Sequence, residues 1–269
     1  MVIILGGLGL IIGSFLNVLI FRQETGEGLM GRSHCRSCRK TLTPLELIPL
    51  ISWMLQRGKC RSCKTSISAQ YPLVEFATAT LFVIVGSVHA DFVELVLALS
   101  IVSLLVAITV YDIRHTLIPD VWSYPLAALA FVYGLVVEPE LSFVPLALHI
   151  IAGPLAALPL YALWFVSGGR WMGFGDVKLA FAIGWVLGAW DGFVAIFFSF
   201  VIGAVVSVCI LLPLPYLLTF AQKIGLFSLR REGSRFTMES EVPFGPFLVA
   251  GCLILWISHL YGVQLPLLP

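Results

Sequence analysis

The sequence predicts an all-α, polytopic membrane protein with about eight transmembrane helices. Of its 269 residues, 59% are hydrophobic and 12% are charged, and the mean hydropathy is +1.00. So few charged side chains cannot cover the surface of a soluble globule of this size. Long apolar segments recur along the whole chain, and a single sizeable polar segment, residues 22–72, interrupts them. The composition excludes a cytosolic enzyme, a secreted disulfide scaffold and a disordered chain.

Eight segments have the length and apolarity of helices that cross about 30 Å of hydrocarbon. They cover residues 2–21, 73–90, 93–111, 121–137, 143–166, 177–190, 192–218 and 243–261. The sixth segment is short, and Asp191-Gly192 marks either a turn or a kink. The sequence therefore leaves open whether residues 177–218 form two spans or one bent helix.

The positions of the charges predict the direction of the spans. With the N-terminus outside, all sixteen Lys and Arg residues fall on the inner side or at its boundary. The inner segments are then 22–72, 112–120, 167–176 and 219–242. Since short cytoplasmic loops are rich in Lys and Arg, both termini are expected in the periplasm. The first segment lacks the basic region and cleavage site of a signal peptide, so we expect a permanent helix.

Glycines are concentrated in the first predicted helix, at Gly6, Gly7, Gly9 and Gly13. A nucleotide-binding loop would need a preceding strand, and the flanking sequence is continuously apolar. The glycines therefore predict close packing against a neighbouring helix.

The polar segment carries two Cys-x2-Cys pairs, Cys35 with Cys38 and Cys60 with Cys63, separated by twenty-one residues. Four thiolates at this spacing are typical of a structural zinc site. Disulfides or redox-active pairs are the alternatives, and the reducing cytoplasmic location argues against disulfides. The sequence thus predicts a small cytoplasmic zinc-binding module between the first and second helices, stabilised largely by its metal. Cys209 and Cys252, which have no partners at ligand spacing, are expected to be buried hydrophobic residues.

Carboxylates at the edge of apolar spans are costly and therefore indicate function. Three fit this description: Glu75, Asp112 and Asp176. Asp112 ends a long apolar run, and Asp176 follows Gly173-Phe174-Gly175 directly before another. Each aspartate also has a structural interpretation, Asp112 as an ion-pair partner of Arg114 and Asp176 as a helix cap.

Two aspartates at one membrane depth predict a joint catalytic role. Peptide hydrolysis without a nucleophilic side chain or a catalytic metal needs one carboxylate to activate water and one carboxylic acid to polarise the carbonyl. A close pair shares a proton and can do both. Asp112 and Asp176 are the predicted pair. Asp120 is the alternative partner, although its position after Pro119 suits the start of a helix.

These residues resemble the type IV prepilin peptidases, the GxGD aspartic proteases that combine a leader peptidase with an N-methyltransferase. The matching motifs, in the order of the family, are Gly13-Ser14-Phe15-Leu16-Asn17-Val18 through Arg22, the paired cysteine knuckles, Tyr71-Pro72-Leu73-Val74-Glu75, Asp112 through Ile118-Pro119-Asp120, Gly173-Phe174-Gly175-Asp176-Val177-Lys178, and Pro243-Phe244-Gly245-Pro246-Phe247. Many relatives have Pro after the first cysteine, where this chain has Arg36.

The resemblance implies a multi-pass enzyme of the bacterial inner membrane. It implies cleavage of type IV prepilins and type II secretion pseudopilins after a Gly at the cytoplasmic boundary, with Asp112 and Asp176 as the catalytic residues. It also implies S-adenosyl-L-methionine as donor for N-methylation of the new N-terminus, although no Gly-rich adenosine-binding loop is visible. Prepilin, pseudopilin and membrane lipid are the expected partners, and nucleic acid is not. The predicted division is a first helix (1–21), the zinc module (22–72) and a catalytic bundle (73–269).

Three questions stay open at this stage. The basic leader needs acidic receivers, and Glu24, Glu27, Glu46 and Glu75 are all candidates. A transporter could use Glu75, Asp112 and Asp176 as an ion path, but such a path needs carboxylates at several depths. A thiol oxidoreductase could use the two cysteine pairs, but it would place them near a quinone or on the oxidising side.

Overall fold

The computed structural model describes residues 1–26, 28, 31–137, 142–211, 213 and 242–263. Its elements are α1 (Val2–Thr25), the 3-10 helix η1 (Pro44–Glu46), α2 (Ile51–Leu55), α3 (Gln70–Gly86), α4 (Phe92–His115), α5 (Asp120–Val137), α6 (Phe143–Ser167), α7 (Phe174–Leu187), α8 (Ala189–Val206), the π-helix η2 (Ser207–Leu211) and α10 (Gly245–Leu260). Within the described residues there is no β-strand, only two isolated bridges. The all-α prediction is confirmed.

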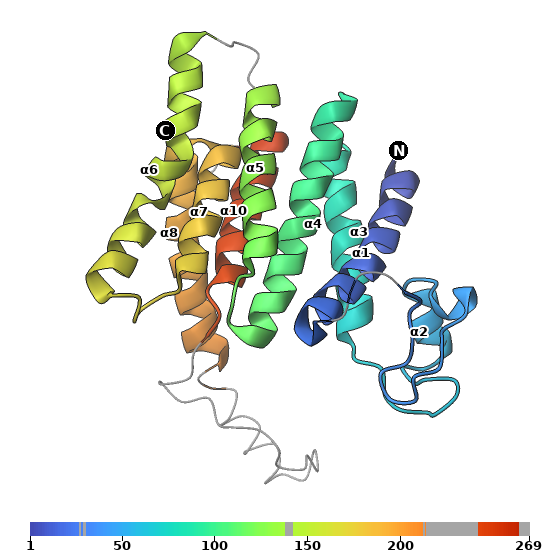
Figure 1. The fold of residues 1–269 in the computed structure, drawn as a ribbon. Helices are drawn as coiled ribbons and strands as arrows, with labels where there is room; N and C mark the ends of the chain where they lie inside the picture. Colours follow the sequence, from blue (N-terminus) through green and yellow to red (C-terminus); the bar gives the residue numbers. More distant parts are fainter. Residues whose placement is uncertain (27, 29–30, 138–141, 212, 214–241, 264–269) are drawn as a thin grey trace.

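Each of the eight predicted spans contains a helix, and these eight helices form an up-and-down bundle (Figure 1). Among the described residues, five helices are long and apolar enough to cross a membrane: α1, α4, α5, α6 and α8, the last extended to Cys209. α3 and α10 are apolar but shorter, and α7 has 14 residues. A helix of that length spans about 21 Å, less than the hydrocarbon core. The number of membrane crossings therefore stays a prediction.

Helices α1 and α3 pack closely because glycines lie in the contact between them. A Cβ added at Gly9 would lie 2.6 Å from Cα of Ala79, and one at Gly13 would lie 2.7 Å from Cα of Glu75. Only glycine permits this approach of the two backbones. Gly7, in contrast, has no atom within 4 Å of such a Cβ. The predicted packing role is confirmed for Gly9 and Gly13 and wrong for Gly7.

Residues 174–206 form two helices, not one bent helix. α7 ends at Leu187, and its C-cap is Gly188, whose φ of 86° is unfavourable for other residues. α8 begins at Ala189. The two helices pack against each other at Gly184 and Gly192, since a Cβ at Gly192 would come within 2.9 Å of Gly184 Cα. The break therefore lies at Gly188 and not at Asp191-Gly192 as the sequence suggested. Residues 212 and 214–218 of the predicted span lie outside the described residues.

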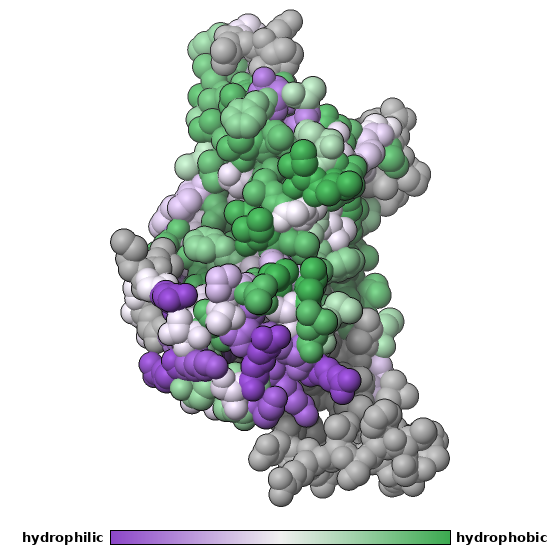
Figure 2. Space-filling model, turned by 90° about the vertical axis from the view of Figure 1, so that its right-hand side faces the viewer, coloured by the Kyte–Doolittle hydropathy of each residue, from purple (hydrophilic) through white to green (hydrophobic). Residues whose placement is uncertain are grey.

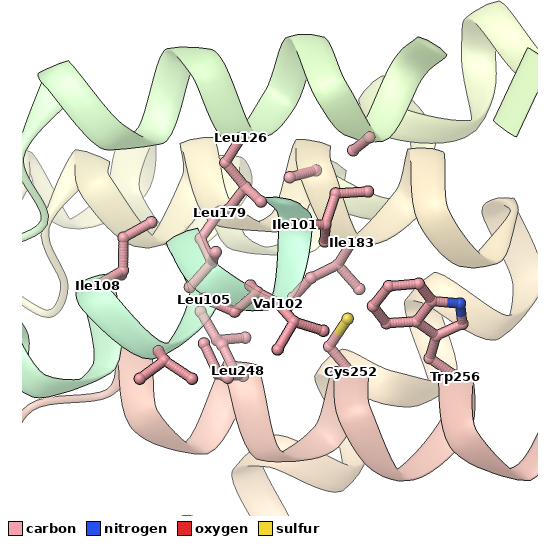
Figure 3. Packing of buried hydrophobic residues seen from close by; sticks show 14 of the residues in the cluster. Ile101, Val102, Leu105, Ile108, Leu126, Leu179, Ile183, Leu248, Cys252 and Trp256 are labelled. Carbon is pink, nitrogen blue, oxygen red and sulfur yellow. The ribbon is translucent and has the colours of Figure 1, made fainter. Parts of the chain in front are cut away.

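The centre of the core lies between α4, α5, α7 and α10 (Figure 3), and the same cluster extends to residues of α1, α3, α6 and α8. Ile101 and Leu105 of α4 are fully buried, as are Leu179 of α7 and Leu248 of α10. Hydrophobic side chains also cover the outside of the bundle, and hydrophilic residues gather at the end that carries the cysteine module (Figure 2). This distribution suits a lipid environment, in which both the interior and the perimeter are apolar.

The module between α1 and α3 folds around two matching cysteine turns. In the first, the N–H of Cys35 donates to Lys40 O at 2.9 Å; in the second, the N–H of Cys60 donates to Thr65 O at 2.9 Å. Arg39 and Lys64, at equivalent places, both have positive φ values near 60°. The second knuckle therefore repeats the local backbone of the first.

Candidate active site

Asp112 lies in the last turn of α4, and its surroundings differ from the simple ion pair that the sequence allowed. Its side chain is buried, with 4% exposure, and Oδ2 accepts a hydrogen bond from the N–H of Gly245 at 3.0 Å. Arg114, the suggested ion-pair partner, instead contacts Glu24 of α1 at 3.2 Å. The carboxyl group of Asp112 is therefore held by a backbone donor from α10, and within the described residues it forms no ion pair with a cation.

Asp176 lies in the first turn of α7, which begins three residues earlier than predicted. The N-cap is Gly173, and no side chain caps the helix. Asp176 is therefore the third residue of the helix and not its N-cap, although its carboxyl group still interacts with the backbone N–H of Gly173. Gly175 packs against Ile118, whose Cβ would lie 2.9 Å from a Cβ added at the glycine. This close approach brings the start of α7 against the α4–α5 connection, and Asp176 is 9% exposed.

Both aspartates line one cavity of about 840 Å³, and their charges interact. The cavity lies where the end of α4, the connections into α5 and α7, and the segment before α10 meet. These segments are at the end of the bundle that also carries the cysteine module (Figure 1). Aromatic and aliphatic side chains form much of the wall: Leu117, Ile118, Leu163, Trp171, Met172, Phe174, Phe200, Val242, Pro243 and Phe244. An open, largely apolar cavity with two carboxyl groups can hold an extended peptide beside them.

Charged side chains at the same cavity come from Asp120, Arg170 and Lys178. Asp120 is the first residue of α5 and forms an ion pair with Lys178 of α7, whose ammonium group also lies over the Tyr124 ring. Because its carboxylate is already paired with a cation, Asp120 is less suited than Asp112 to share a proton with Asp176.

Glu75, the third candidate carboxylate, lies in a different place. It is buried near the start of α3, and its Oε2 accepts the N–H of Leu50 at 2.8 Å. Leu50 belongs to the module and has an unusual φ of 59°. Glu75 therefore connects the module to the bundle. It does not line the cavity of the two aspartates, whereas a transporter that used all three carboxylates would need them along one ion path.

The four predicted metal ligands, Cys35, Cys38, Cys60 and Cys63, come together. One sulfur from each lies within 4.8 Å of the others, and Sγ of Cys35 is 3.8 Å from Sγ of Cys63. In a tetrahedral zinc site with bonds of about 2.3 Å, neighbouring sulfurs are about 3.8 Å apart. All four cysteines are free of disulfides. The donor set and its spacing fit a zinc ion.

Neighbouring groups favour the thiolate that binds a metal at two of the four cysteines, Cys35 and Cys63. Interactions with the side chain and the backbone N–H of Thr65 lower the pKa of Cys63 to about 6. A hydrogen bond from the backbone N–H of Cys38 lowers the pKa of Cys35. Despite a hydrogen bond from the backbone N–H of Lys40, burial and the neighbouring thiols raise the pKa of Cys38 to about 11. Of the other cysteines, Cys252 is buried as predicted, whereas the prediction for Cys209 is wrong because that residue is exposed.

Comparisons with known proteins agree with this arrangement. The profile described as the type IV leader peptidase family matches residues 99–208, and that of the bacterial peptidase A24 N-terminal domain matches residues 8–90. The prepilin leader peptidase/N-methyltransferase of Bacillus subtilis (strain 168) is 34% identical, and the alignment covers 94% of this chain and 92% of that protein. This chain belongs to the type IV leader peptidase family. Proteins of the same name from Aeromonas hydrophila and Aeromonas salmonicida (strain A449) are 34% and 32% identical, each over 94% of this chain and 88% of the relative. No solved structure matches.

As a member of the type IV leader peptidase family, the chain is an integral membrane protein. The first family profile ends at residue 90, after α3, and the second begins at residue 99, within α4, so the cysteine module shares one profile with α1 and α3. Sequence reasoning missed the contact of Gly245 with Asp112. The signal was the motif Pro243-Phe244-Gly245-Pro246-Phe247, in which a glycine between prolines indicates a backbone that must approach a neighbour.

Proposed function

We propose that this protein is an intramembrane aspartic endopeptidase that removes the leader of type IV prepilins and type II secretion pseudopilins, and that it N-methylates the new N-terminus. The family membership and the names of the relatives support the reaction class. The observation that carries the catalytic assignment is the burial of Asp112 and Asp176 at one cavity, although sixty-four residues separate them in the chain. The cleaved bond follows a Gly of the substrate.

In this mechanism one carboxylate takes a proton from water while the other, protonated, donates a hydrogen bond to the scissile carbonyl oxygen. The water oxygen attacks the carbonyl carbon, and the tetrahedral intermediate collapses when the leaving nitrogen is protonated. The N–H of Gly245 holds Oδ2 of Asp112, which fixes the orientation of that carboxyl group before substrate binds. The apolar wall limits water around the pair and strengthens these interactions.

We also propose that the chain lies in the cytoplasmic membrane with both termini in the periplasm and with the active site and module at the cytoplasmic face. The distribution of Lys and Arg supports this orientation. The division into a first helix (1–21), a module (22–72) and a catalytic bundle (73–269) belongs to the same proposal. Lipid surrounds the bundle, consistent with its hydrophobic perimeter.

The proposed cofactors are a structural zinc ion and S-adenosyl-L-methionine. Cys35, Cys38, Cys60 and Cys63 would hold the zinc, and their mutual distances support it. S-adenosyl-L-methionine supplies an electrophilic methyl group when bound. The methyltransferase half rests on the names of the relatives.

The full chain in detergent, incubated with a prepilin-like peptide and S-adenosyl-L-methionine, tests the function by mass analysis of the products. We expect a fragment that begins after the Gly and then a mass increase of one methyl group on that fragment. An intact peptide, with zinc-loaded and folded protein present, would contradict the peptidase assignment. Cleavage without the added methyl group would contradict the transferase half alone.

A further inference from the structure

A second cavity, of about 290 Å³, lies between the cysteine module and the membrane helices α1 and α3. The wall on the membrane side consists of Ser14, Val18, Phe21 and Arg22 of α1 with Tyr71 and Glu75 of α3, and the module forms the rest. Among the described residues, none lines both this cavity and that of the aspartates. Its described lining residues all fall within residues 8–90, the range of the first family profile. The chain therefore offers a second site that is spatially separate from the proposed hydrolytic one.

An aromatic ring in this cavity is held in a fixed position. Nε1 of Trp53 donates to Ile67 O at 3.3 Å. Gly58 packs against the same ring, and a Cβ at Gly58 would lie 2.9 Å from it. Because both contacts come from the module, the indole keeps its orientation without a ligand. A fixed indole offers a surface on which a planar heterocycle can stack.

Charged groups of both signs lie at the same cavity. Hydrogen bonds from the N–H and the hydroxyl of Thr43, at 3.0 and 2.9 Å, keep the pKa of Glu46 below its ordinary value, so this carboxylate is ionised at neutral pH. Glu75 adds a second carboxyl group on the membrane side. The guanidinium of Arg36 lies 3.9 Å from the centre of the Phe21 ring. The cavity, which Arg22 also lines, thus combines an aromatic surface, acidic groups and guanidinium groups.

We propose that this cavity binds S-adenosyl-L-methionine and is the methyl-transfer site, an inference that rests on the proposed function. The donor has a purine ring, a sulfonium cation and an amino-acid carboxylate. Trp53 would stack on the purine, Glu46 and Glu75 would attract the cation, and Arg36 would pair with the carboxylate. The volume is close to the lower end of small-molecule sites, about 300 Å³.

The transfer step follows from this arrangement. The free amine of the cleaved substrate attacks the methyl carbon, a nitrogen–carbon bond forms, and the carbon–sulfur bond breaks with its electrons left on sulfur. The product is a neutral thioether and a methylated ammonium, which loses its proton to water or to a carboxylate. Since most of the wall belongs to the module, the cysteine cluster would be needed for donor binding as well as for the fold of the module.

Direct binding tests the proposal independently of catalysis. The full chain in detergent is dialysed against isotope-labelled S-adenosyl-L-methionine, and zinc content and prepilin cleavage are measured on the same samples. We expect Trp53→Leu and Glu75→Gln each to weaken donor binding at least tenfold while cleavage continues. Val18→Phe, which fills the cavity from α1 and leaves the module unchanged, should do the same. Trp190→Phe, an exposed tryptophan of α8, is the matched control and should bind like the parent chain.

The outcomes separate this inference from the proposed function. Donor binding at the parental affinity in folded Val18→Phe and Glu75→Gln proteins would overturn it. A loss of affinity for a basic leader peptide in these variants, with donor binding unchanged, would assign the cavity to the leader and overturn it as well. Donor binding that depends on the cavity, in a protein that cleaves no prepilin, would support the site and refute the peptidase.

Discussion

The N–H of Gly245 donates to Oδ2 of Asp112 at 3.0 Å, across 133 residues of sequence. A Cβ at position 245 would lie 2.6 Å from that same oxygen, so any side chain there displaces the carboxyl group. Gly245→Ala should therefore reduce prepilin cleavage about 100-fold, the effect of misplacing a catalytic group by about 1 Å. Peptide cleavage followed by mass spectrometry measures it. Gly7→Ala, which meets no atom, should retain the parental rate, and equal rates for both variants would contradict the geometry.

The aspartate pair predicts how the rate of cleavage falls in the single and double Asn variants. Asp112→Asn and Asp176→Asn each keep the shape of the side chain but remove the shared proton, so cleavage should fall by several orders of magnitude. The double variant should be little slower than either single variant, because the pair acts as a unit. Asp120→Asn, which removes the partner of Lys178, should retain substantial cleavage. Near-normal processing by Asp176→Asn would exclude the pair.

The cysteine cluster predicts one zinc per chain. Cys60→Ser replaces the most buried of the four ligands and should remove most of the bound metal. Because metal binding and folding of such a module are one process, residues 31–69 should become sensitive to protease while the bundle stays intact. Metal analysis and limited proteolysis check both effects. Cys209→Ser, outside the cluster, should keep its zinc, and a parental chain purified without zinc would refute the site.

The α1–α3 contact predicts a difference between two glycines of one helix. Gly13→Ala forces its methyl group against the backbone of Glu75 and should destabilise the protein by about 1–3 kcal/mol, as overpacking does. Gly7→Ala meets open space and should be neutral, or stabilising by up to about 1 kcal/mol through helix propensity. Thermal unfolding in detergent compares them. The same loss of stability in both variants would show that packing is not the cause.

The orientation predicts opposite labelling of the two ends of the bundle. Cysteines introduced at Asp91 and Ser142 should react with a membrane-impermeant thiol reagent added from the periplasm. A cysteine at Trp171, beside the proposed active site, should react only after the membrane is permeabilised. Immediate labelling of all three positions would contradict the predicted topology.

The sequence by itself determined where the helices lie, that the four cysteines form a cluster, and which aspartates are the catalytic candidates. Apolar segments of span length located all eight helices of the bundle, because lipid demands long apolar helices with satisfied backbones. The spacing of the cysteine pairs predicted the cluster, and the rarity of carboxylates in apolar spans singled out Asp112 and Asp176. Each of these signals is local, so it can be read without knowing which helices are neighbours.

The tertiary structure decided the contacts between distant segments. It showed that Gly245 holds Asp112, that Glu24 rather than Asp112 pairs with Arg114, and that Glu75 belongs to the module interface. It also moved the break between α7 and α8 to Gly188, where the positive φ ends one helix before the next begins. Apolar periodicity identifies helices in a membrane but not their partners, because lipid-facing and protein-facing residues are equally apolar.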